Sequence, residues 1–413
     1  MDENEPRILL LDDEGFMLNL LSHTLKGLGF SRLTLCDNGR EALRHVASAS
    51  PPDVILLDLN MPDMDGVEFA RRLAENNYSG TLVLVSGEGE RILHMVEKLI
   101  QAHAITILGY LHKPFSRPDL QAIMAKAMES LRHKPTPSKA YDAQALSQAI
   151  AERQLVNFYQ PKVDIASKEV VGVEALVRWE HPTDGLVYPV QFIGIAEDHH
   201  LIDALTREVV RGALAQARRW RSIGLNLKMS INVSMDNLCS LDFAEFMIGE
   251  AERADVAPQD ILLEVTESRL MLDQRVALEV LARLRMKRFQ MAIDDFGTGH
   301  SSLSQLRDIP FDELKIDHGF VHDACKDPTA RAIYDASLAL GKQLGMVVVA
   351  EGVEDEDDWN MLLQGNCDLA QGFFVGKPMR AEAVAGWLQA WRERCDALDR
   401  ESSGSHAAWP TRH

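Results

Sequence analysis

The sequence has few cysteines and no long apolar segment. Its 413 residues include five cysteines, which are scattered, odd in number and free of any CxxC pair. This usage argues against a disulfide framework and a catalytic cysteine, and it is typical of a reducing compartment. No apolar run is long enough to span a bilayer. The first residues, MDENEP, are acidic where a signal peptide would be basic. We therefore expect a cytoplasmic protein with no membrane partner.

The sequence also has fewer basic than acidic residues. Lysine and arginine total 43 against 62 aspartates and glutamates, for a formal net charge of −19. Such a field repels nucleic acids and anionic membranes, so no nucleic-acid polymer is expected as a partner. An anionic substrate would need local help from metal ions or basic side chains. The hydrophobic content of 46% is ample for sizeable cores, and the length suits two or three domains.

The chain is expected to form two α/β domains joined by a linker. The segment RHKPTPSKA, rich in proline and basic residues, lies in the predicted linker 132–142. Residues 1–131 alternate apolar runs with amphipathic stretches, which predicts a doubly wound, flavodoxin-like parallel sheet. Residues 143–396 contain eight such apolar runs, which favours a (β/α)₈, TIM-like barrel. The remaining residues, 397–413, are polar and are expected to form a disordered tail.

The first two strands of the barrel are expected to follow each other without a helix between them. The connection ASKE (166–169) between the first two apolar runs is too short for a helical crossover. Those two strands should therefore run antiparallel to each other.

Three aspartates mark the predicted site of the first domain. Asp12 and Asp13 end the first strand, and Asp58 ends the third, in LLDLNMPDMDG. Ligands of open parallel sheets bind at the carboxyl ends of the strands, and three carboxylates there suit Mg²⁺. Ser86 and Lys113 follow later strands, where a lysine could hold a phosphoryl oxygen.

In this order, these residues resemble the response-regulator receiver domain over about residues 6–130. The resemblance implies that Asp58 accepts phosphate from a sensor histidine kinase or a phosphotransfer protein. It also implies that Asp12, Asp13 and Asp58 hold one Mg²⁺. The residues implied in phosphoryl binding and switching are Asn60, Ser86, Tyr110 and Lys113.

In the second domain, strand after strand ends in an acid or an amide. An unpaired charge inside an apolar strand is costly, and bound cations are the simplest compensation. The oxygen donors select Mg²⁺ or Mn²⁺ over a histidine and cysteine zinc site. The candidate site residues of this domain, which lie at or near the strand ends, are Glu174, Asn232, Glu264, Glu267, Asp294, Asp295, Lys315, Asp317, Glu351, Glu354 and Gln371.

Asp294 and Asp295 are adjacent in MAIDDFGTGHSSL, and it must be explained how two neighbouring carboxylates could reach the same site. Neighbouring side chains on a regular strand point to opposite faces, but at a strand end the backbone can turn and bring both carboxylates to one place. Two ions about 3.5–4 Å apart can clamp a phosphoryl group, and Asp294 is placed to bridge them. The alternative is an acidic, solvated turn.

The motifs EALVRW, INVS, EVTES, DDFGTGHSSL, LKID, EGVE and QGFF resemble, in order, the EAL-domain phosphodiesterases over about residues 143–392. Those enzymes cut cyclic di-GMP to linear pGpG. The implied first metal ion is bound by Glu174, Asn232, Glu264 and Asp294, and the second by Asp294, Asp295 and Glu351, with Asp317 near the water between them. Lys315, Glu174 and Glu351 are the implied catalytic residues, with Lys315 orienting the water and helping to deprotonate it.

The same resemblance implies further roles. Substrate contacts are implied for Gln160, Leu176, Arg178, Asp317, Glu354 and Gln371. Glu267 would anchor the glycine-rich loop, and homodimers or higher homo-oligomers are implied by the family alone. His300 departs from the tyrosine that is more frequent at that loop position.

Other interpretations remain at this point. Glu267 could be only an acid at a helix start, and Lys315 could be a surface lysine. His199 and His200 are adjacent on a predicted helix and face apart, which argues against a metal pair. The whole domain could be a non-catalytic cyclic di-GMP sensor or a protein-docking module. A DNA-binding regulator is disfavoured by the charge.

Overall fold

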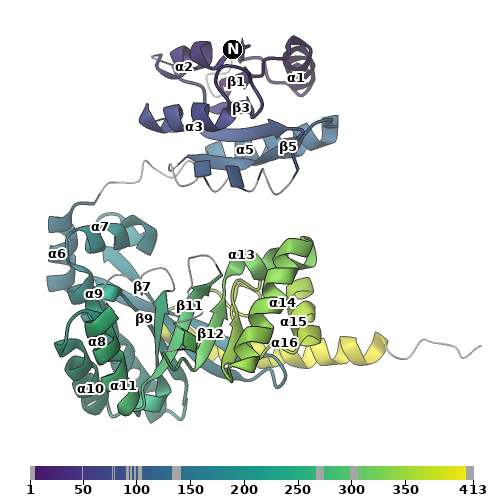
Figure 1. The fold of residues 1–413 in the computed structure, drawn as a ribbon. Coiled ribbons are helices and arrows are strands. Elements are labelled where there is room, and N and C mark those ends of the chain that lie inside the picture. The colour runs from purple at the N-terminus through teal and green to yellow at the C-terminus, as the bar shows by residue number, and fades with distance from the viewer. Residues whose placement is uncertain are drawn as a thin grey trace, which may run out of the picture. The chain divides into compact units, whose positions relative to one another are not determined.

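The structure is a computed structural model. The described residues are 5–48, 50–76, 78, 80–89, 93, 95–96, 99–100, 105–132, 141–266, 274–297, 306–307 and 309–405. They belong to two compact units, Met1–Lys139 and Ala140–His413 (Figure 1). Each unit has its own sheet and its own core.

One parallel sheet of five strands organises the N-terminal unit. The strands are β1 (Ile8–Leu11), β2 (Leu33–Cys36), β3 (Val54–Asp58), β4 (Thr81–Ser86) and β5 (Thr106–His112). Their spatial order is β2-β1-β3-β4-β5, and all pairings are parallel. This is the flavodoxin-like order, with its switch point between β1 and β3, so the predicted fold of this domain is confirmed.

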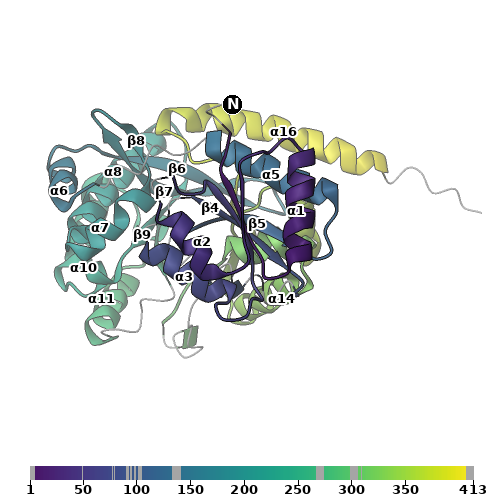
Figure 2. The same cartoon turned by 90° about the horizontal axis from the view of Figure 1, so that it is seen from above.

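Helices cover both faces of this sheet (Figure 2). One face packs against α1 (Gly15–Gly27) and α5 (Arg117–Arg132), and the other against α2 (Gly39–Val46) and α3 (Gly66–Glu75). The central strands β1, β3 and β4 are buried along their whole length, which is why their sequences are almost entirely apolar. Polar groups are therefore concentrated at the strand ends.

The C-terminal unit is a closed barrel. Its strands are β6 (Leu155–Asp164), β7 (Val170–His181), β9 (Lys228–Val233), β10 (Ile261–Thr266), β11 (Gln290–Phe296), β12 (Glu313–Ile316), β13 (Val347–Ala350) and β14 (Leu369–Ala370). They follow one another in the order β6-β14-β13-β12-β11-β10-β9-β7, and the pairing of β6 with β7 closes the ring.

The first barrel strand runs against its neighbours. β6 is antiparallel to both β7 and β14, whereas the other neighbouring strands of the ring are parallel. The predicted barrel with an antiparallel first strand is thus confirmed. A further strand, β8 (Gly185–Val187), pairs antiparallel with the end of β7. The sequence analysis did not predict β8, because three residues are too few to show a strand period.

Helices surround the barrel. The α-helices in the described part of this unit are α6 (Ala143–Ala151), α7 (Ile193–Asp198), α8 (Ile202–Ser222), α9 (Met235–Leu238), α10 (Asp242–Ala254), α11 (Gln274–Met286), α13 (His318–Val321), α14 (Pro328–Gln343), α15 (Glu356–Gly365) and α16 (Val384–Ser405). Short 3₁₀ turns occupy Pro189–Gln191, Pro258–Asp260, His322–Cys325 and Ala381–Ala383.

Alternation along the barrel strands separates the core from the site. On β7, Val173 and Ala175 belong to the apolar core that the helices cover, and Glu174 between them is on the opposite face. On β10, Glu264 likewise stands between the core residues Leu263 and Val265. Charged side chains of several strands therefore converge inside the barrel.

The ends of the second domain differ in part from the prediction. Helix α16 continues to Ser405, into the segment that we expected to be a disordered tail. Alanine, leucine and arginine, which favour helices, extend it past residue 396. Residues 406–413, and residues 133–140 of the predicted linker, lie outside the described residues.

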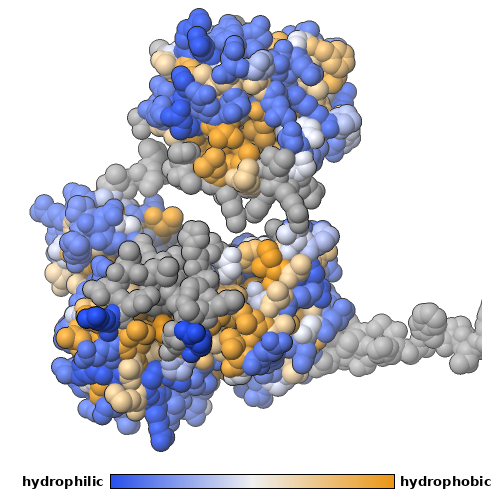
Figure 3. Space-filling model, in the orientation of Figure 1, coloured by the Kyte–Doolittle hydropathy of each residue, from blue (hydrophilic) through white to orange (hydrophobic). Residues whose placement is uncertain are grey.

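The face seen in Figure 3 carries many hydrophilic side chains, with apolar areas on each unit. Large exposed apolar residues in the described ranges include Phe16, Met95, Val190 and Phe373. Among the described helices, none combines the length and the apolar character that a bilayer crossing requires.

Candidate active site

Lys315 lies at the centre of a buried carboxylate cluster inside the barrel. Its side chain on β12 is 1% exposed, so it is not a surface lysine. Four carboxylates surround its Nζ, with oxygens of Glu264 and Glu351 at 2.7 Å, Asp294 at 2.9 Å and Glu174 at 3.6 Å. One ammonium offsets only one of these four negative charges.

The pKa values of the cluster reflect this excess of acid. Burial, together with the neighbouring carboxylates, raises the pKa of Glu174 to about 7 and that of Glu351 to about 8. Burial opposes the charged form of Glu264 as well, but the ammonium groups of Lys315 and Lys162 hold its pKa at about 2. Burial disfavours the Lys315 ammonium, yet the surrounding carboxylates raise its pKa well above the usual value.

The backbone of β11 brings the two adjacent aspartates together. Asp295 has a φ of 54°, in the left-handed region, and the register with β12 shifts between Ile293 and Phe296. As a result, carboxylate oxygens of Asp294, Asp295 and Glu351 lie within 4.8 Å of one another. Burial and the nearby Asp294 raise the pKa of Asp295 to about 6. The acidic pair is part of a cluster and not an isolated solvated turn.

The donors of this cluster fit divalent cations. Asp294 Oδ1 is buried without a hydrogen bond, although the Lys315 ammonium is 2.9 Å away. Asn232 on β9 donates its side-chain amide to Glu174 Oε1 at 2.6 Å, which leaves its carbonyl oxygen available as a ligand. An all-oxygen donor set with an excess of negative charge is suited to Mg²⁺ or Mn²⁺.

Strand β7 presents two of the predicted substrate residues on the same face as Glu174. Glu174, Leu176 and Arg178 are two residues apart and therefore point to the same side. The guanidinium of Arg178 lies 5.6 Å from the ring centre of Phe158 and 5.2 Å from that of Tyr188. These cation–π contacts hold the charge in place at the edge of the site.

Two glutamines connect β6 and β14 to Glu174. Gln371, directly after β14, donates to Glu174 Oε2 at 2.6 Å and to Gln160 Oε1 at 3.3 Å. Gln160 on β6 donates in turn to the carbonyl of Gly376 at 3.2 Å. Both predicted glutamines are therefore buried beside the cluster and help to orient Glu174.

A pocket opens next to the cluster and contains residues that the sequence analysis missed. The predicted residues on its wall are Gln160, Glu174, Glu351, Glu354 and Gln371, and the new ones are His318, Gly352, Gly372 and Phe373. Gly352 has a φ of 67°, and a Cβ there would lie 2.1 Å from His318 Nδ1. Gly352, Gly372 and Phe373 lie within the EGVE and QGFF motifs, and His318 directly follows LKID, so their place in or beside a motif was the available signal.

Asp317 and Glu354 lie at the rim of the site. Asp317 follows β12 and caps α13 by accepting from the amide of Gly319 at 2.9 Å. The side chain of Glu354 is exposed, and its amide donates to the buried Asp358 carboxylate at 2.9 Å. Two further predictions, Glu267 and His300, lie outside the described residues.

The receiver residues also come together. Lys113 Nζ lies 2.7 Å from Asp12 Oδ2 and 2.9 Å from Asp58 Oδ1, and oxygens of Asp12, Asp13 and Asp58 lie within 4.8 Å of one another. Burial raises the pKa of Asp58, against the opposing effect of Lys113. Ser86 is buried at the end of β4. This edge of the sheet can hold a cation beside a buried carboxylate.

Two other predicted receiver residues, Asn60 and Tyr110, make their contacts outside the Asp12–Asp13–Asp58 cluster. Asn60 donates to Glu88 Oε1 at 2.8 Å, which directs its amide toward the loop after β4. The ring of Tyr110 is 44% exposed and packs edge-on against His112, with ring centres 5.4 Å apart.

Comparison with known families gives two matches. Residues 143–378 match the family described as EAL domain, and residues 8–125 match the family described as response regulator receiver domain. The chain is similar to cyclic di-GMP phosphodiesterase RocR of Pseudomonas aeruginosa, with 31% identity over 91% of this chain and 97% of the relative. It is also similar to cyclic di-GMP phosphodiesterase PdeR of Escherichia coli K12, with 36% identity over 60% of this chain and 38% of that relative.

Solved structures resemble the barrel unit. One, titled as the PaMucR phosphodiesterase in complex with c-di-GMP, has a TM-score of 0.56 and 40% sequence identity. The match covers 58% of this chain and 98% of that structure.

Proposed function

Since this chain belongs to the EAL domain family and carries a receiver domain before its barrel, we propose that it is a response regulator that hydrolyses cyclic di-GMP. The product is linear 5′-pGpG, formed by attack of water on one phosphodiester. The cluster around Lys315 is the observation that carries the proposal, because four carboxylates converge on one ammonium beside an open pocket.

The cluster would hold two divalent cations. Glu174, Asn232, Glu264 and Asp294 would ligate the first, and Asp294, Asp295 and Glu351 the second, with Asp317 nearby. Bound there, Mg²⁺ or Mn²⁺ would orient the phosphate and make the attacking water more acidic. The turn at Asp295 supports this division, because it aims both aspartates at one place.

Lys315 would orient the attacking water. Its ammonium can donate hydrogen bonds to a water between the carboxylates. When those carboxylates ligate cations, they hold the lysine proton less strongly, so the ammonium could release that proton to solvent and the resulting neutral amine could accept a proton from the attacking water. A buried acceptor next to the reacting atoms is the arrangement that general base catalysis needs.

Residues of β7 and of the pocket wall would bind the substrate. Arg178, steadied by two aromatic rings, would pair with a phosphate. Gln160 and Gln371 line the pocket, and Leu176 lies between Glu174 and Arg178 on the same face of β7. The exposed carboxylate of Glu354 is suited to accept from the N–H groups of a guanine edge.

The direct test is hydrolysis by the purified full-length chain. We expect wild type to convert cyclic di-GMP to pGpG with Mg²⁺ or Mn²⁺, and Glu174→Gln to convert less than about 1% as fast while it still binds the nucleotide. The readouts are chromatography of the nucleotides and calorimetric binding. If wild type binds cyclic di-GMP and leaves it whole with both metals, the barrel is a sensor module.

Phosphorylation of Asp58 would control this activity. The buried carboxylate beside Lys113 and Asp12 is the acceptor that the receiver geometry supports, and a sensor histidine kinase or phosphotransfer protein would be the donor. The added charge would bias the receiver between two states, and this bias would reach the barrel.

We expect Asp58→Asn to prevent phosphorylation and to leave basal hydrolysis within about twofold of wild type, because Asp58 belongs to the separate N-terminal unit. Acetyl phosphate is the donor, and phosphate-affinity electrophoresis and the rate of pGpG formation are the readouts. The control is Asp63→Asn, an aspartate of the same loop outside the Asp12–Asp13–Asp58 cluster. Loss of basal hydrolysis in Asp58→Asn alone would contradict an input that is separable from the chemistry.

A further inference from the structure

A second buried lysine lies beneath the active-site cluster. Lys162 on β6 is 2% exposed, and its Nζ lies 3.0 Å from Glu313 Oε2 and 3.4 Å from Glu264 Oε1. Glu313 on β12 is also buried. Four charged side chains therefore alternate in sign through the barrel interior, in the order Glu313, Lys162, Glu264 and Lys315.

Strand register places Lys162 and Glu313 one layer of side chains below Glu174 and Lys315 in the barrel interior. Glu313 precedes Lys315 by two residues on β12, so their side chains share a face. Lys162 is paired with Gly172, which precedes Glu174 by two residues on β7. Side chains inside such barrels fill layers of this kind, usually with apolar groups. Here one layer holds an ion pair instead.

Lys162 and Lys315 contact different carboxylate oxygens of Glu264. Oε1 faces Lys162 and Oε2 faces Lys315, so the carboxylate is held from two sides and cannot rotate without losing one partner. A buried ion pair is not needed for stability alone, because well-packed apolar residues often serve as well. The charged layer therefore calls for a role in the site above it.

We infer that Lys162, balanced by Glu313, is a positioning residue that fixes the orientation of Glu264 for cation binding. This rests on the proposed function, in which Glu264 is a ligand. Lys162 does not touch substrate. Partners of this kind orient a ligand and change metal affinity by about 10- to 100-fold when they are removed.

The test compares Mn²⁺ binding by full-length variants without substrate. Lys162→Met alone would leave Glu313 buried without a partner and could fail to fold, so the decisive variant is Lys162→Met with Glu313→Gln. We expect this double variant to fold and to bind Mn²⁺ at the barrel site about 10- to 100-fold more weakly, while Glu313→Gln alone stays closer to wild type. Electron paramagnetic resonance of free Mn²⁺ measures the affinity.

A matched control separates positioning from a general loss of stability. Arg285→Met with Asp312→Asn removes another ion pair of the barrel unit, one whose residues make no ion pair with Glu264. It should lower stability and leave Mn²⁺ affinity unchanged. A folded Lys162→Met/Glu313→Gln protein with wild-type affinity would overturn the inference. Absence of hydrolysis by wild type would count against the proposed function alone, since the Mn²⁺ measurement uses no substrate.

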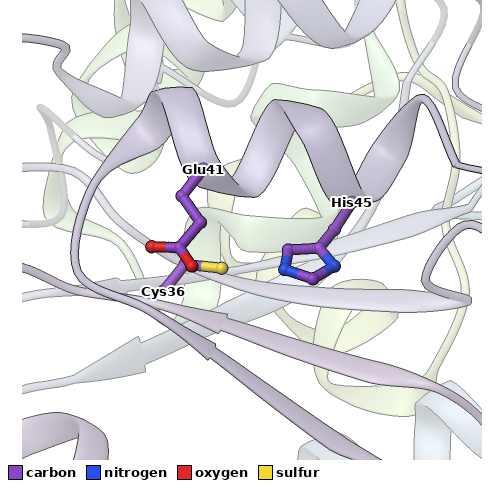
Figure 4. Close-up of side chains that lie close together, drawn as sticks. All are labelled: Cys36, Glu41 and His45. Carbon is purple, nitrogen blue, oxygen red and sulfur yellow. The ribbon is translucent and has the colours of Figure 1, made fainter.

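A different observation points to a second site, in the receiver. Cys36 ends β2, and Glu41 and His45 lie four residues apart on one side of α2. Figure 4 shows both helical side chains directed toward the strand, with the Cys36 sulfur beside them. One ligand atom of each residue lies within 4.8 Å of the others.

The three groups are available and partly oriented. Among the described residues, neither the Cys36 thiol nor the His45 ring has a hydrogen-bond partner. Asn38 caps α2 by accepting from the Glu41 amide at 2.9 Å, and its side-chain amide lies 3.4 Å from Glu41 Oε2.

We propose that Cys36, Glu41 and His45 form a site for Zn²⁺ or a similar borderline-soft divalent ion. Sulfur, nitrogen and oxygen donors suit Zn²⁺, unlike the all-oxygen clusters elsewhere in this chain, and water would take the fourth position. The site lies next to the phosphorylation cluster, because the Asp12 amide donates to the Cys36 carbonyl at 3.3 Å.

Co²⁺ titration of the full chain tests this site. With excess Mg²⁺ occupying the oxygen sites, we expect one equivalent of Co²⁺ to give a thiolate charge-transfer band in the near ultraviolet, which Zn²⁺ removes. The band should disappear in Cys36→Ser and also in His45→Gln, whose exposed side chain can change without loss of the fold. Cys239→Ser is the matched control and should keep it. Absence of the band in wild type, or its persistence in Cys36→Ser, would overturn the proposal.

Discussion

Replacing Lys315 with methionine should reduce cyclic di-GMP hydrolysis by about 10³-fold or more. The ammonium is the only basic group within 4 Å of Glu351 and Asp294 among the described residues. Its loss removes the group that would orient the attacking water. Methionine has a similar length, so the packing of the barrel interior should change little.

The same substitution should make folding depend on divalent cations. Without Lys315, four buried carboxylates lose their common partner, and an uncompensated buried charge of this kind costs about 3–5 kcal/mol. Mn²⁺ can supply the missing positive charge. Urea unfolding should therefore show a large loss of stability in chelator and a partial recovery with Mn²⁺, which wild type should show less.

Lys228→Met is the control, because Lys228 is an exposed lysine on another barrel strand, β9. It should behave like wild type in both measurements. Hydrolysis by Lys315→Met within threefold of wild type would rule out a role for this lysine in proton transfer. Unchanged stability in chelator would mean that the cluster carries less negative charge than the geometry implies.

Much of this site could be predicted from the sequence because strand ends in a barrel meet at one edge. Glu174, Glu264 and Lys315 each interrupt an apolar run, and a charge in such a place needs a partner. The register of parallel strands then brings the partners together. The antiparallel first strand followed from the length of one connection, and it places Gln160 beside Glu174.

Other features needed coordinates. Nothing in DDF shows that Asp295 adopts a positive φ, since the backbone turn depends on the shifted pairing of β11 with β12. The pairing of Lys162 with Glu313 depends on which strands face each other across the barrel, and the two residues are far apart in sequence. Nothing in the sequence around Cys36 indicates a metal ligand. Only the structure shows that α2 brings the carboxylate of Glu41 and the imidazole of His45 beside its thiol.

The affinity of the barrel site for Mn²⁺ should rise by about a hundredfold or more between pH 6 and pH 8. The carboxyl groups of Glu174 and Glu351 have pKa values of about 7 and 8, so both are largely protonated at pH 6. Cation binding needs the carboxylates and must displace these protons, and each pKa unit corresponds to about 1.4 kcal/mol. Above pH 8 the displacement ends and the affinity should level off.

The stability of the metal-free protein should change in the opposite direction. In the unfolded chain both groups ionise near pH 4.5, and in the folded barrel only near pH 7 and 8. The folded state therefore holds more protons between these values, and its stability should fall as the pH rises from about 5 to 8. Glu264 acts in the other sense, since its lowered pKa gives stability that is lost only as the pH falls from about 4.5 toward 2.

Glu351→Gln separates these effects from cation binding by the receiver. It removes the carboxyl group with a pKa of about 8, so the rise in Mn²⁺ affinity above pH 7 should become shallower. Calorimetry in two buffers of different ionisation enthalpy gives the number of protons released. Wild type should release more protons than Glu351→Gln at pH 7. Equal release by the two proteins would show that the Glu351 carboxyl is already ionised in the metal-free barrel, and Lys315 alone would then balance the site.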